Sequence, residues 1–225
     1  RRIHEVLISG VPVSWFEGGT EKSNIARLVD LDNAANGWLV VNQFEVVGQT
    51  ARRPDIIFFL NGMPLIVIEL KGTESGSLKG AHNQIETYKS QVPDLFRTNA
   101  FNVISEGVTA RFGSLSANYD RFMRWRTVDG EDLVDESSAL ALQTLMQGLL
   151  DQEVILEMLR YCTVFEDEGK GPIKKIAGYH QFHAVRKGVS AVIAARGNDG
   201  RGGVMWHTQG SGKSLLMTFL GGRLM

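Results

Sequence analysis

The sequence has little cysteine and almost no net charge. Cys162 is the single cysteine among 225 residues, so no intrachain disulfide can form, and this is typical of a reducing compartment. We expect its thiol to be a small buried apolar group rather than a nucleophile. The net charge is −1, so any contact with nucleic acid must come from local clusters of lysine and arginine.

Long apolar runs are also missing. No run approaches the roughly 18 to 20 residues that span a bilayer, and the opening "RRIHEVLISG" lacks the apolar region of a secretory signal. We therefore expect a cytoplasmic protein without membrane contact. The sequence stops soon after a glycine-rich loop and its following helix, so we interpret it as an N-terminal portion of something larger.

The first half of the sequence predicts a mixed α/β sheet flanked by helices. Residues 3–16 are expected to be a helix end or strand leading into a Gly-Pro turn, and Asn61-Gly62 is a hairpin signal between two apolar runs. The remaining predicted elements are a helix at 81–93, strands at 37–48, 55–60, 65–71, 100–107 and 110–116, and an edge strand within 121–130.

The second half changes character. Residues 135–165 have helical spacing, with cap residues at Asp135–Ser138 and a second helix start at Asp151. The charged stretch 166–172 reads as a linker. A second unit then begins near Ile173, and its predicted parts are a helix over 179–195, a glycine-rich loop over 196–203, a short strand over 204–207, and a further loop and helix.

Charged residues interrupt the hairpin that is otherwise built to be buried. Glu69 and Lys71 share a strand face because side chains alternate along a strand. A two-residue turn pairs residue 55 with 68 and sends Asp55 to the opposite face. An odd loop or a bulge pairs 55 with 69 and brings Asp55 and Glu69 together.

If Asp55, Glu69 and Lys71 converge, their side chains suit metal-dependent cleavage of a phosphodiester. Asp55, Glu69 and the backbone carbonyl of Leu70 are hard oxygen donors suited to Mg²⁺. A bound Mg²⁺ polarises a phosphodiester and activates water, and Lys71 can orient that water or stabilise negative charge. The alternative is a solvent-facing ion pair at a strand end, which contributes little.

The order Pro-Asp55, thirteen residues, Glu69-x-Lys71 resembles the PD-(D/E)xK nuclease superfamily. Gln84 and Tyr88 lie four residues apart on one helical face and match the QxxxY motif of its RecB-like branch, in which these side chains support the site and contact DNA. Taken alone, they would be an ordinary helix surface. The basic stretch "RFMRWR" at 121–126 could contact DNA or simply be the polar face of a strand.

The stretch "HTQGSGKS" at 207–214 is expected between a strand and a helix, the setting of a phosphate-binding loop. Gly210 and Gly212 let backbone N–H groups approach phosphate, Lys213 reaches the β- and γ-phosphates, and Ser214 is placed for Mg²⁺. His207 stands where the full pattern has glycine, a departure that superfamily 2 helicases tolerate.

Upstream, "GYHQFHAV" at 178–185 resembles the Q-motif of superfamily 2 motors. That resemblance implies that Gln181 reads the adenine edge of ATP. On its own, Gln181 would be a helix-surface residue. No acidic Walker B motif follows, so we do not expect this segment to hydrolyse ATP efficiently.

Together these segments resemble the restriction subunit (HsdR) of Type I restriction–modification enzymes. The resemblance implies a PD-(D/E)xK endonuclease domain at 1–130, a helical connector at 131–170 and the start of a RecA-like motor at 171–225. It also implies double-stranded DNA as substrate, Mg²⁺ and ATP as cofactors, and methylation and specificity subunits as partners.

Two other interpretations stay open at this stage. A helicase–nuclease of DNA repair shares both halves, and co-purification with a methyltransferase would separate the two. A non-catalytic DNA-binding or scaffolding module would make the charged hairpin only an ion pair. A motor with a degenerate nuclease half is disfavoured by the intact Asp55, Glu69 and Lys71 set.

Overall fold

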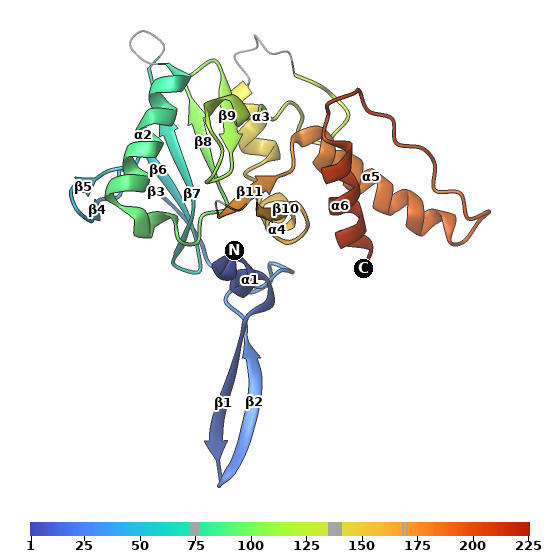
Figure 1. Cartoon of the computed structure of the whole chain (residues 1–225), viewed down its shortest axis with the longest axis horizontal. Coiled ribbons are helices and arrows are strands. Elements are labelled where there is room, and N and C mark those ends of the chain that lie inside the picture. Colours follow the sequence, from blue (N-terminus) through green and yellow to red (C-terminus); the bar gives the residue numbers. More distant parts are fainter. Residues whose placement is uncertain (73–76, 135–140, 168, 170) are drawn as a thin grey trace.

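A five-stranded mixed sheet forms the centre of the chain (Figure 1). Its strand order is β3-β6-β7-β8-β9, and within it β7 and β8 pair in parallel while the other neighbours are antiparallel. This confirms the predicted mixed sheet. The strands are β3 (Trp38–Asn42), β6 (Ile56–Leu60), β7 (Met63–Leu70), β8 (Phe101–Ser105) and β9 (Ala110–Gly113). The computed structural model describes residues 1–72, 77–134, 141–167, 169 and 171–225.

Each face of the sheet has its own core, because successive side chains of β7 alternate between the faces. Val67 packs with Ile85 of helix α2 on one face. Ile68 belongs to the larger core on the other face, which also holds residues of the helices α3, α4 and α5. The helices span α2 (Leu78–Gln91), α3 (Ala141–Gly148), α4 (Gln152–Tyr161) and α5 (Tyr179–Ala195).

The predicted helical region 135–165 contains α3 and α4. Asp151 caps α4 as expected, since its carboxylate accepts from the backbone N–H groups of Glu153 and Val154. The expected cap at Asp135–Ser138 lies outside the described residues. Cys162 follows α4 and is fully buried. The burial is as expected, and it raises the pKa of the thiol to about 12.

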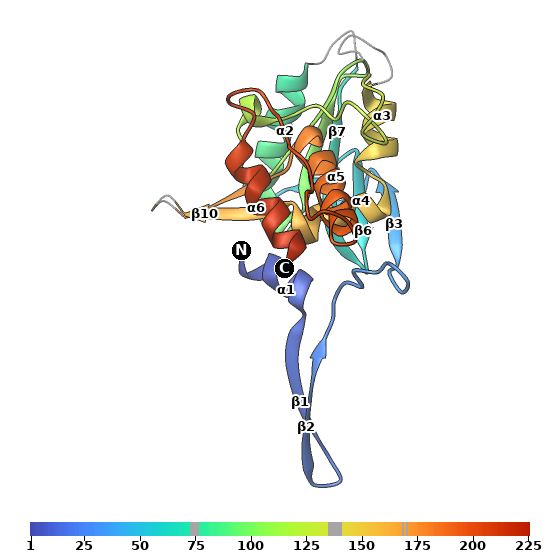
Figure 2. The same ribbon diagram turned by 90° about the vertical axis from the view of Figure 1, so that its right-hand side faces the viewer.

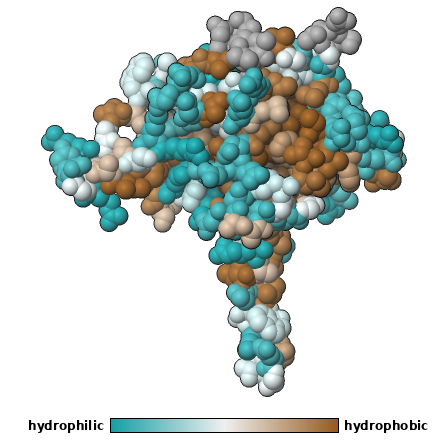
Figure 3. Space-filling view, turned by 180° about the vertical axis from the view of Figure 1, so that it is seen from behind, coloured by the Kyte–Doolittle hydropathy of each residue, from teal (hydrophilic) through white to brown (hydrophobic). Residues whose placement is uncertain are grey.

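A two-stranded arm projects from the body (Figures 1 and 2). Helix α1 (Arg2–Ser9) ends at Gly10, whose φ is 77°, and β1 (Val11–Glu17) then pairs with β2 (Thr20–Ala26). The sequence indicated a helix and a turn here but not this hairpin. Trp15 and Phe16 are exposed, and Figure 3 shows apolar surface along the arm.

The stretch 166–172 was predicted to be a linker, and this is wrong. Strand β10 (Thr163–Asp167) pairs antiparallel with β11 (Pro172–Ile176), so Glu166, Asp167 and Pro172 belong to a hairpin. Glu166 and Lys175 pair across it. Gly169 and Gly171 have positive φ, which a turn requires and which a glycine adopts without strain.

Two further predicted strands are not formed. Within 121–130 the ladder is limited to one bridge between Met123 and Phe112, because Trp125 turns into the core against Phe112. Residues 204–207 are not in a strand either. Val204 is 93% exposed, and none of the described strands pairs with this segment.

The remaining elements are short or lie at the edges. They are the strands β4 (Val46–Val47) and β5 (Ala51–Arg52), the 3₁₀ turns η1 (Pro93–Phe96) and η2 (Tyr119–Arg121), and helix α6 (Lys213–Leu224). Among the described residues, no helix has the length and apolar character to cross a membrane.

Candidate active site and nucleotide loop

A bulge in the β6–β7 hairpin brings the predicted acids together. Asn61 and Gly62 both have positive φ, as the two-residue turn of an Asn-Gly hairpin requires. The ladder then skips Leu65, and beyond the skip Ile56 pairs with Ile68. The next residues along, 55 and 69, therefore lie opposite each other. This is the bulged register that the functional interpretation required.

Pro64 is the local reason for the bulge. Proline has no N–H to donate to a ladder, so inside a sheet it occurs at edges and bulges. Its carbonyl accepts from Thr98, and the carbonyl of the skipped Leu65 accepts from the backbone of Ala100. Pro64 is therefore a residue from which the bulged register could have been predicted in the sequence.

The four predicted residues of the hairpin converge. One oxygen of the Asp55 carboxylate accepts from the backbone N–H of Leu70 at 2.8 Å. The Nζ of Lys71 lies 2.7 Å from Oε1 of Glu69. Glu69 is only 3% exposed, so this is no surface ion pair. A buried carboxylate of this kind needs its partners.

The electrostatics of Glu69 are those of a crowded acid. Burial raises the pKa of the Glu69 carboxyl, and the nearby charge of Asp55 raises it further. Hydrogen bonds from Lys71 and Tyr88 act in the opposite direction. A buried acid with a raised pKa, beside a second carboxylate and a lysine, is typical of functional sites.

Helix α2 supplies the predicted Gln84 and Tyr88. It begins where the Ser77 hydroxyl accepts from the backbone N–H of Gly80. The Tyr88 hydroxyl donates to Oε2 of Glu69 at 3.2 Å, and Gln84 lies near enough to Tyr88 to lower the pKa of its hydroxyl in part. Burial and the charge of Glu69 raise the pKa of Tyr88, so its hydroxyl keeps its proton. Both side chains thus support the acid.

An open depression of about 440 Å³ lies at the edge of this site, and Glu69, Gln84 and Tyr88 are not among the residues that line it. Asp55, Leu70 and Lys71 line it. Gln43 lines it too, and its side-chain amide donates to Asp55 at 2.8 Å. Sequence reasoning missed Gln43, because it belongs to no motif that we considered. It directly follows β3, the strand next to β6, and that neighbourhood was its one signal.

The donor set fits a hard divalent cation. The carboxylates of Asp55 and Glu69 and the carbonyl of Leu70 are oxygen ligands, and Mg²⁺ takes one or two carboxylates and keeps several waters. Burial raises the pKa of Glu69 and the charge of Asp55 raises it further, and a cation bound between the two carboxylates would relieve their repulsion. Within the described residues, no group of three or more His, Cys, Asp or Glu side chains could hold a metal, and a two-acid site needs none.

The glycine-rich loop at 207–214 leads into α6. Gly210 and Gly212 have φ of 82° and 78°, and Gly212 precedes the first turn of the helix. The Nζ of Lys213 donates to the carbonyls of His207 and Thr208, each at 3.0 Å. Ser214 is exposed on the first turn. The loop therefore offers free backbone N–H groups, a lysine and a hydroxyl beside one helix N-terminus.

Gln181 contacts this loop. Its amide nitrogen donates to the carbonyls of Ser211 and Gly212 at 3.2 and 3.1 Å, and its carbonyl accepts from Gly178 at 2.9 Å. The buried side chain is therefore no free surface residue of α5. The structure brings the two predicted nucleotide segments together through Gln181.

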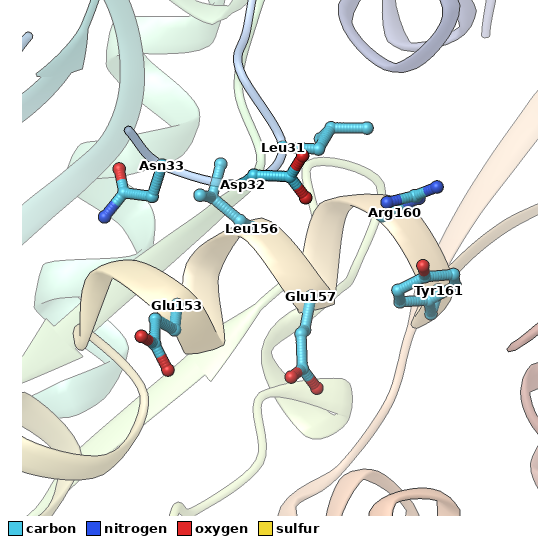
Figure 4. Close-up of a pocket in the computed structure, with 8 residues that line it drawn as sticks. All are labelled: Leu31, Asp32, Asn33, Glu153, Leu156, Glu157, Arg160 and Tyr161. Carbon is cyan, nitrogen blue, oxygen red and sulfur yellow. The ribbon is translucent and has the colours of Figure 1, made fainter. Parts of the chain in front are cut away.

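A second hollow, of about 180 Å³, lies elsewhere, between α4 and residues 31–33 (Figure 4). It contains none of the predicted site residues. Glu157 of α4 borders it and is held bidentately by Arg186 of α5, at 3.0 Å from each oxygen, and also by Arg223 of α6. Burial raises the pKa of Glu157, but the two arginines outweigh it and the pKa is lowered.

Comparisons with known proteins identify the family of the chain. Residues 1–121 match the family Type I restriction enzyme R protein N terminus, and residues 180–225 match SWI2/SNF2 ATPase. The chain is 43% identical over 99% of its length to the Type I restriction enzyme HindI endonuclease subunit of Haemophilus influenzae, of which this covers 22%.

More distant relatives are also named as endonuclease subunits of type I restriction enzymes. The chain is 32% identical over 96% of its length to the MjaIXP endonuclease subunit of Methanocaldococcus jannaschii, and the match covers 23% of that subunit. It is 29% identical over 80% of its length to the SauCOLORF180P endonuclease subunit of Staphylococcus aureus, and that match covers 18% of the subunit. The chain thus spans about a fifth of the length of the curated relatives it matches. Because the first family match covers more than half of the 225 residues, the chain belongs to the Type I restriction enzyme R protein N-terminal family.

Proposed function

We propose that this chain is the nuclease end of a Type I restriction subunit, a Mg²⁺-dependent endonuclease that cleaves double-stranded DNA. In the whole protein, cleavage is coupled to ATP-driven translocation. The observation that carries the proposal is the convergence of Asp55, Glu69 and Lys71 on one sheet face through the bulged hairpin. The family and the names of the relatives support it.

The roles of the nuclease residues follow from their contacts. Asp55, Glu69 and the Leu70 carbonyl would hold Mg²⁺, which, when bound, supplies polarisation of the phosphodiester and an acidified water. Lys71 neutralises Glu69 and is placed to orient water or to stabilise negative charge. Tyr88 fixes the second oxygen of Glu69, and we assign Gln84 a supporting role beside Tyr88.

The nucleotide roles rest on the loop geometry. Gly210 and Gly212 give backbone access to phosphate, Lys213 meets the β- and γ-phosphates, and Ser214 serves the Mg²⁺ of ATP. We assign the adenine edge to Gln181, which holds the loop at the same time. In this proposal the nuclease domain covers 1–130, the connector 131–170 and the first motor lobe starts at 171.

The proposed partners are double-stranded DNA and the methylation and specificity subunits of a Type I complex, in the cytoplasm. A DNA-repair helicase–nuclease is the competing function. Co-purification of the whole subunit with a methyltransferase supports restriction, whereas an active subunit that never associates with one supports repair.

The first test uses the whole subunit, assembled with its partners on a circular plasmid that carries a recognition site. DNA cleavage and ATP hydrolysis are followed in the same tube for wild type and Lys71→Ala. We expect cleavage to fall at least about 100-fold, a loss typical for one electrostatic group of an active site, with ATP hydrolysis kept. Lys22→Ala is the control, since Lys22 is exposed on the arm and pairs with Glu17.

The outcomes separate the two activities. Cleavage that survives in Lys71→Ala would show that this hairpin is not the nuclease site. Loss of both activities would indicate that Lys71 supports folding or assembly rather than chemistry. Lys213→Ala should abolish ATP hydrolysis and, with it, the cleavage that depends on translocation, although the nuclease residues are untouched.

A further inference from the structure

Gln43 stands out in the backbone of the chain. Three non-glycine residues in the described chain have positive φ: Asn33, Gln43 and Asn61. Asparagine tolerates this left-handed region because its short side chain bonds locally, whereas other side chains are rarely found there. The chain thus uses the tolerant residue at two of the positions and a longer, less tolerant one at the third.

The longer side chain of Gln43 reaches the candidate metal site. Its amide nitrogen donates to Oδ1 of Asp55 at 2.8 Å, while the backbone N–H of Leu70 donates to Oδ2. With a donor on each oxygen, the Asp55 carboxylate is fixed in rotation. Each oxygen keeps a second lone pair for another partner.

The main chain of Gln43 holds Asp55 as well. Its backbone N–H donates to the Asp55 carbonyl at 3.0 Å. β3 ends at Asn42, and at Gln43 the chain leaves the sheet before it returns at β6. The left-handed turn thus points the side chain back to the strand that carries Asp55. An asparagine would suit this backbone, but it is one methylene shorter.

We propose that Gln43 is a positioning residue of the nuclease site, kept in a strained backbone so that its amide orients Asp55 toward the divalent cation. This inference rests on the proposed function. It adds a residue that no sequence motif of the hairpin includes. Backbone strain at functional sites is maintained when surrounding contacts determine it, and here the two hydrogen bonds to Asp55 are those contacts.

The test separates strain from positioning. Gln43→Gly relieves the left-handed strain and removes the amide, and Gln43→Asn relieves the strain with an amide too short to reach. We expect both variants of the whole subunit to be at least as thermally stable as wild type. We expect them to bind Mn²⁺, used as the probe in the absence of nucleotide, about 10- to 100-fold more weakly, as is typical when a group that orients a metal ligand is lost.

Two controls accompany the measurement by titration calorimetry. Asp55→Ala defines the signal of this site, because it removes a proposed ligand. Asn61→Gly is the matched control, since Asn61 is also left-handed and its amide also makes hydrogen bonds, to Leu28 and Asn36, away from the depression. That variant should lose stability and keep its Mn²⁺ affinity. The Mg²⁺ concentration for half-maximal plasmid cleavage is the second readout.

The results separate the positioning role of Gln43 from the existence of the metal site. If Asp55→Ala abolishes Mn²⁺ binding but both Gln43 variants bind like wild type, the role of Gln43 is wrong and the proposed nuclease site stands. If Asp55→Ala leaves Mn²⁺ binding unchanged, the metal site itself is wrong, and Gln43 with it. If the Gln43 variants lose stability as Asn61→Gly does, Gln43 is a structural residue and not a positioning one.

Discussion

At the scale of single residues, the candidate site depends on the hydrogen-bond partners of one buried carboxylate, that of Glu69. Glu69 has Lys71 on one oxygen and Tyr88 on the other, and its pKa is nevertheless raised, because burial and Asp55 oppose its charge. Binding of a cation requires the charged form. The affinity of the site for metal should therefore fall, as the pH is lowered, earlier than it would for an ordinary glutamate.

The variant Tyr88→Phe tests this. It keeps the ring in its core but removes the donor to Glu69, so the pKa of Glu69 rises further and the loss of Mn²⁺ affinity moves to higher pH. At neutral pH we expect roughly 10-fold weaker binding, the lower end of the range for such partners. Titrations across a pH series check it, with Tyr119→Phe as the control. An unshifted pH profile would contradict this role of the hydroxyl.

Residue patterns predicted that Asp55, Glu69, Lys71 and Tyr88 lie near one another, but they did not predict the neighbouring Gln43. Asp55, Glu69, Lys71, Gln84 and Tyr88 follow a spaced motif and are found together. Gln43 could not be found this way, because its role depends on where β3 ends beside β6 rather than on any spacing. The catalytic roles of the motif residues stay predictions until they are measured.

At the scale of elements, the side chain of Gln181 links the start of α5 to the loop that precedes α6. Gln181, in the first turn of α5, holds the carbonyls that precede α6. The sequence suggested that Gln181 reads adenine, whereas the contacts also make it a support for the phosphate loop. These two roles make different predictions for nucleotide selectivity.

The variant Gln181→Ala distinguishes the roles of Gln181. If it supports the loop, ATP and GTP should lose affinity alike, by about 10-fold for the loss of two modest hydrogen bonds, and their ratio should stay as in wild type. Nucleotide competition binding to the whole subunit measures this. A selective loss for ATP would instead assign Gln181 to the adenine edge, as the motif implies.

Element prediction failed where tertiary packing decided the outcome. The stretch 166–172 was interpreted as a linker, but Glu166 and Asp167 lie at the end of strand β10, which pairs with β11. Trp125 interrupts the predicted strand because an aromatic pocket beside Phe112 and Phe182 takes its ring. Where local chemistry was sufficient, as at Asn61-Gly62 and at the Asp151 cap, the prediction was confirmed.

At the scale of the whole molecule, a buried lysine joins the sheet to the β10–β11 hairpin. Lys174 of β11 donates to the carbonyl of Asn99, beside β8, at 2.7 Å. The lysine is 8% exposed, and burial lowers its pKa to about 7. His4 of α1 lies near enough for the charge of Lys174 to help burial lower the pKa of the imidazole to about 4.

This lysine makes the stability of the chain depend on pH. Between pH 7 and 10.5 the unfolded chain binds the proton of Lys174 more readily than the folded chain does, so the free energy of unfolding rises with pH across this window. Below pH 7 the full penalty of burying the charge is present. Lys174→Met keeps the aliphatic stem without the charge.

We therefore expect Lys174→Met to be more stable than wild type at pH 6. At pH 10 it should be slightly less stable, by about 1 kcal/mol, because the hydrogen bond to Asn99 is lost. Urea denaturation of the 225-residue chain at the two pH values measures both differences. A difference of equal size and sign at pH 6 and pH 10 would contradict the burial of a titrating amine.

The arm has a practical consequence for handling the chain. Among the described strands, β1 and β2 pair only with each other, so each leaves one row of backbone donors and acceptors open beside the exposed Trp15 and Phe16. Open strand edges with apolar side chains template pairing with other chains. Concentrated solutions of the isolated chain should therefore self-associate through the arm first, and a lysine in place of Phe16 is the change that would improve its solubility.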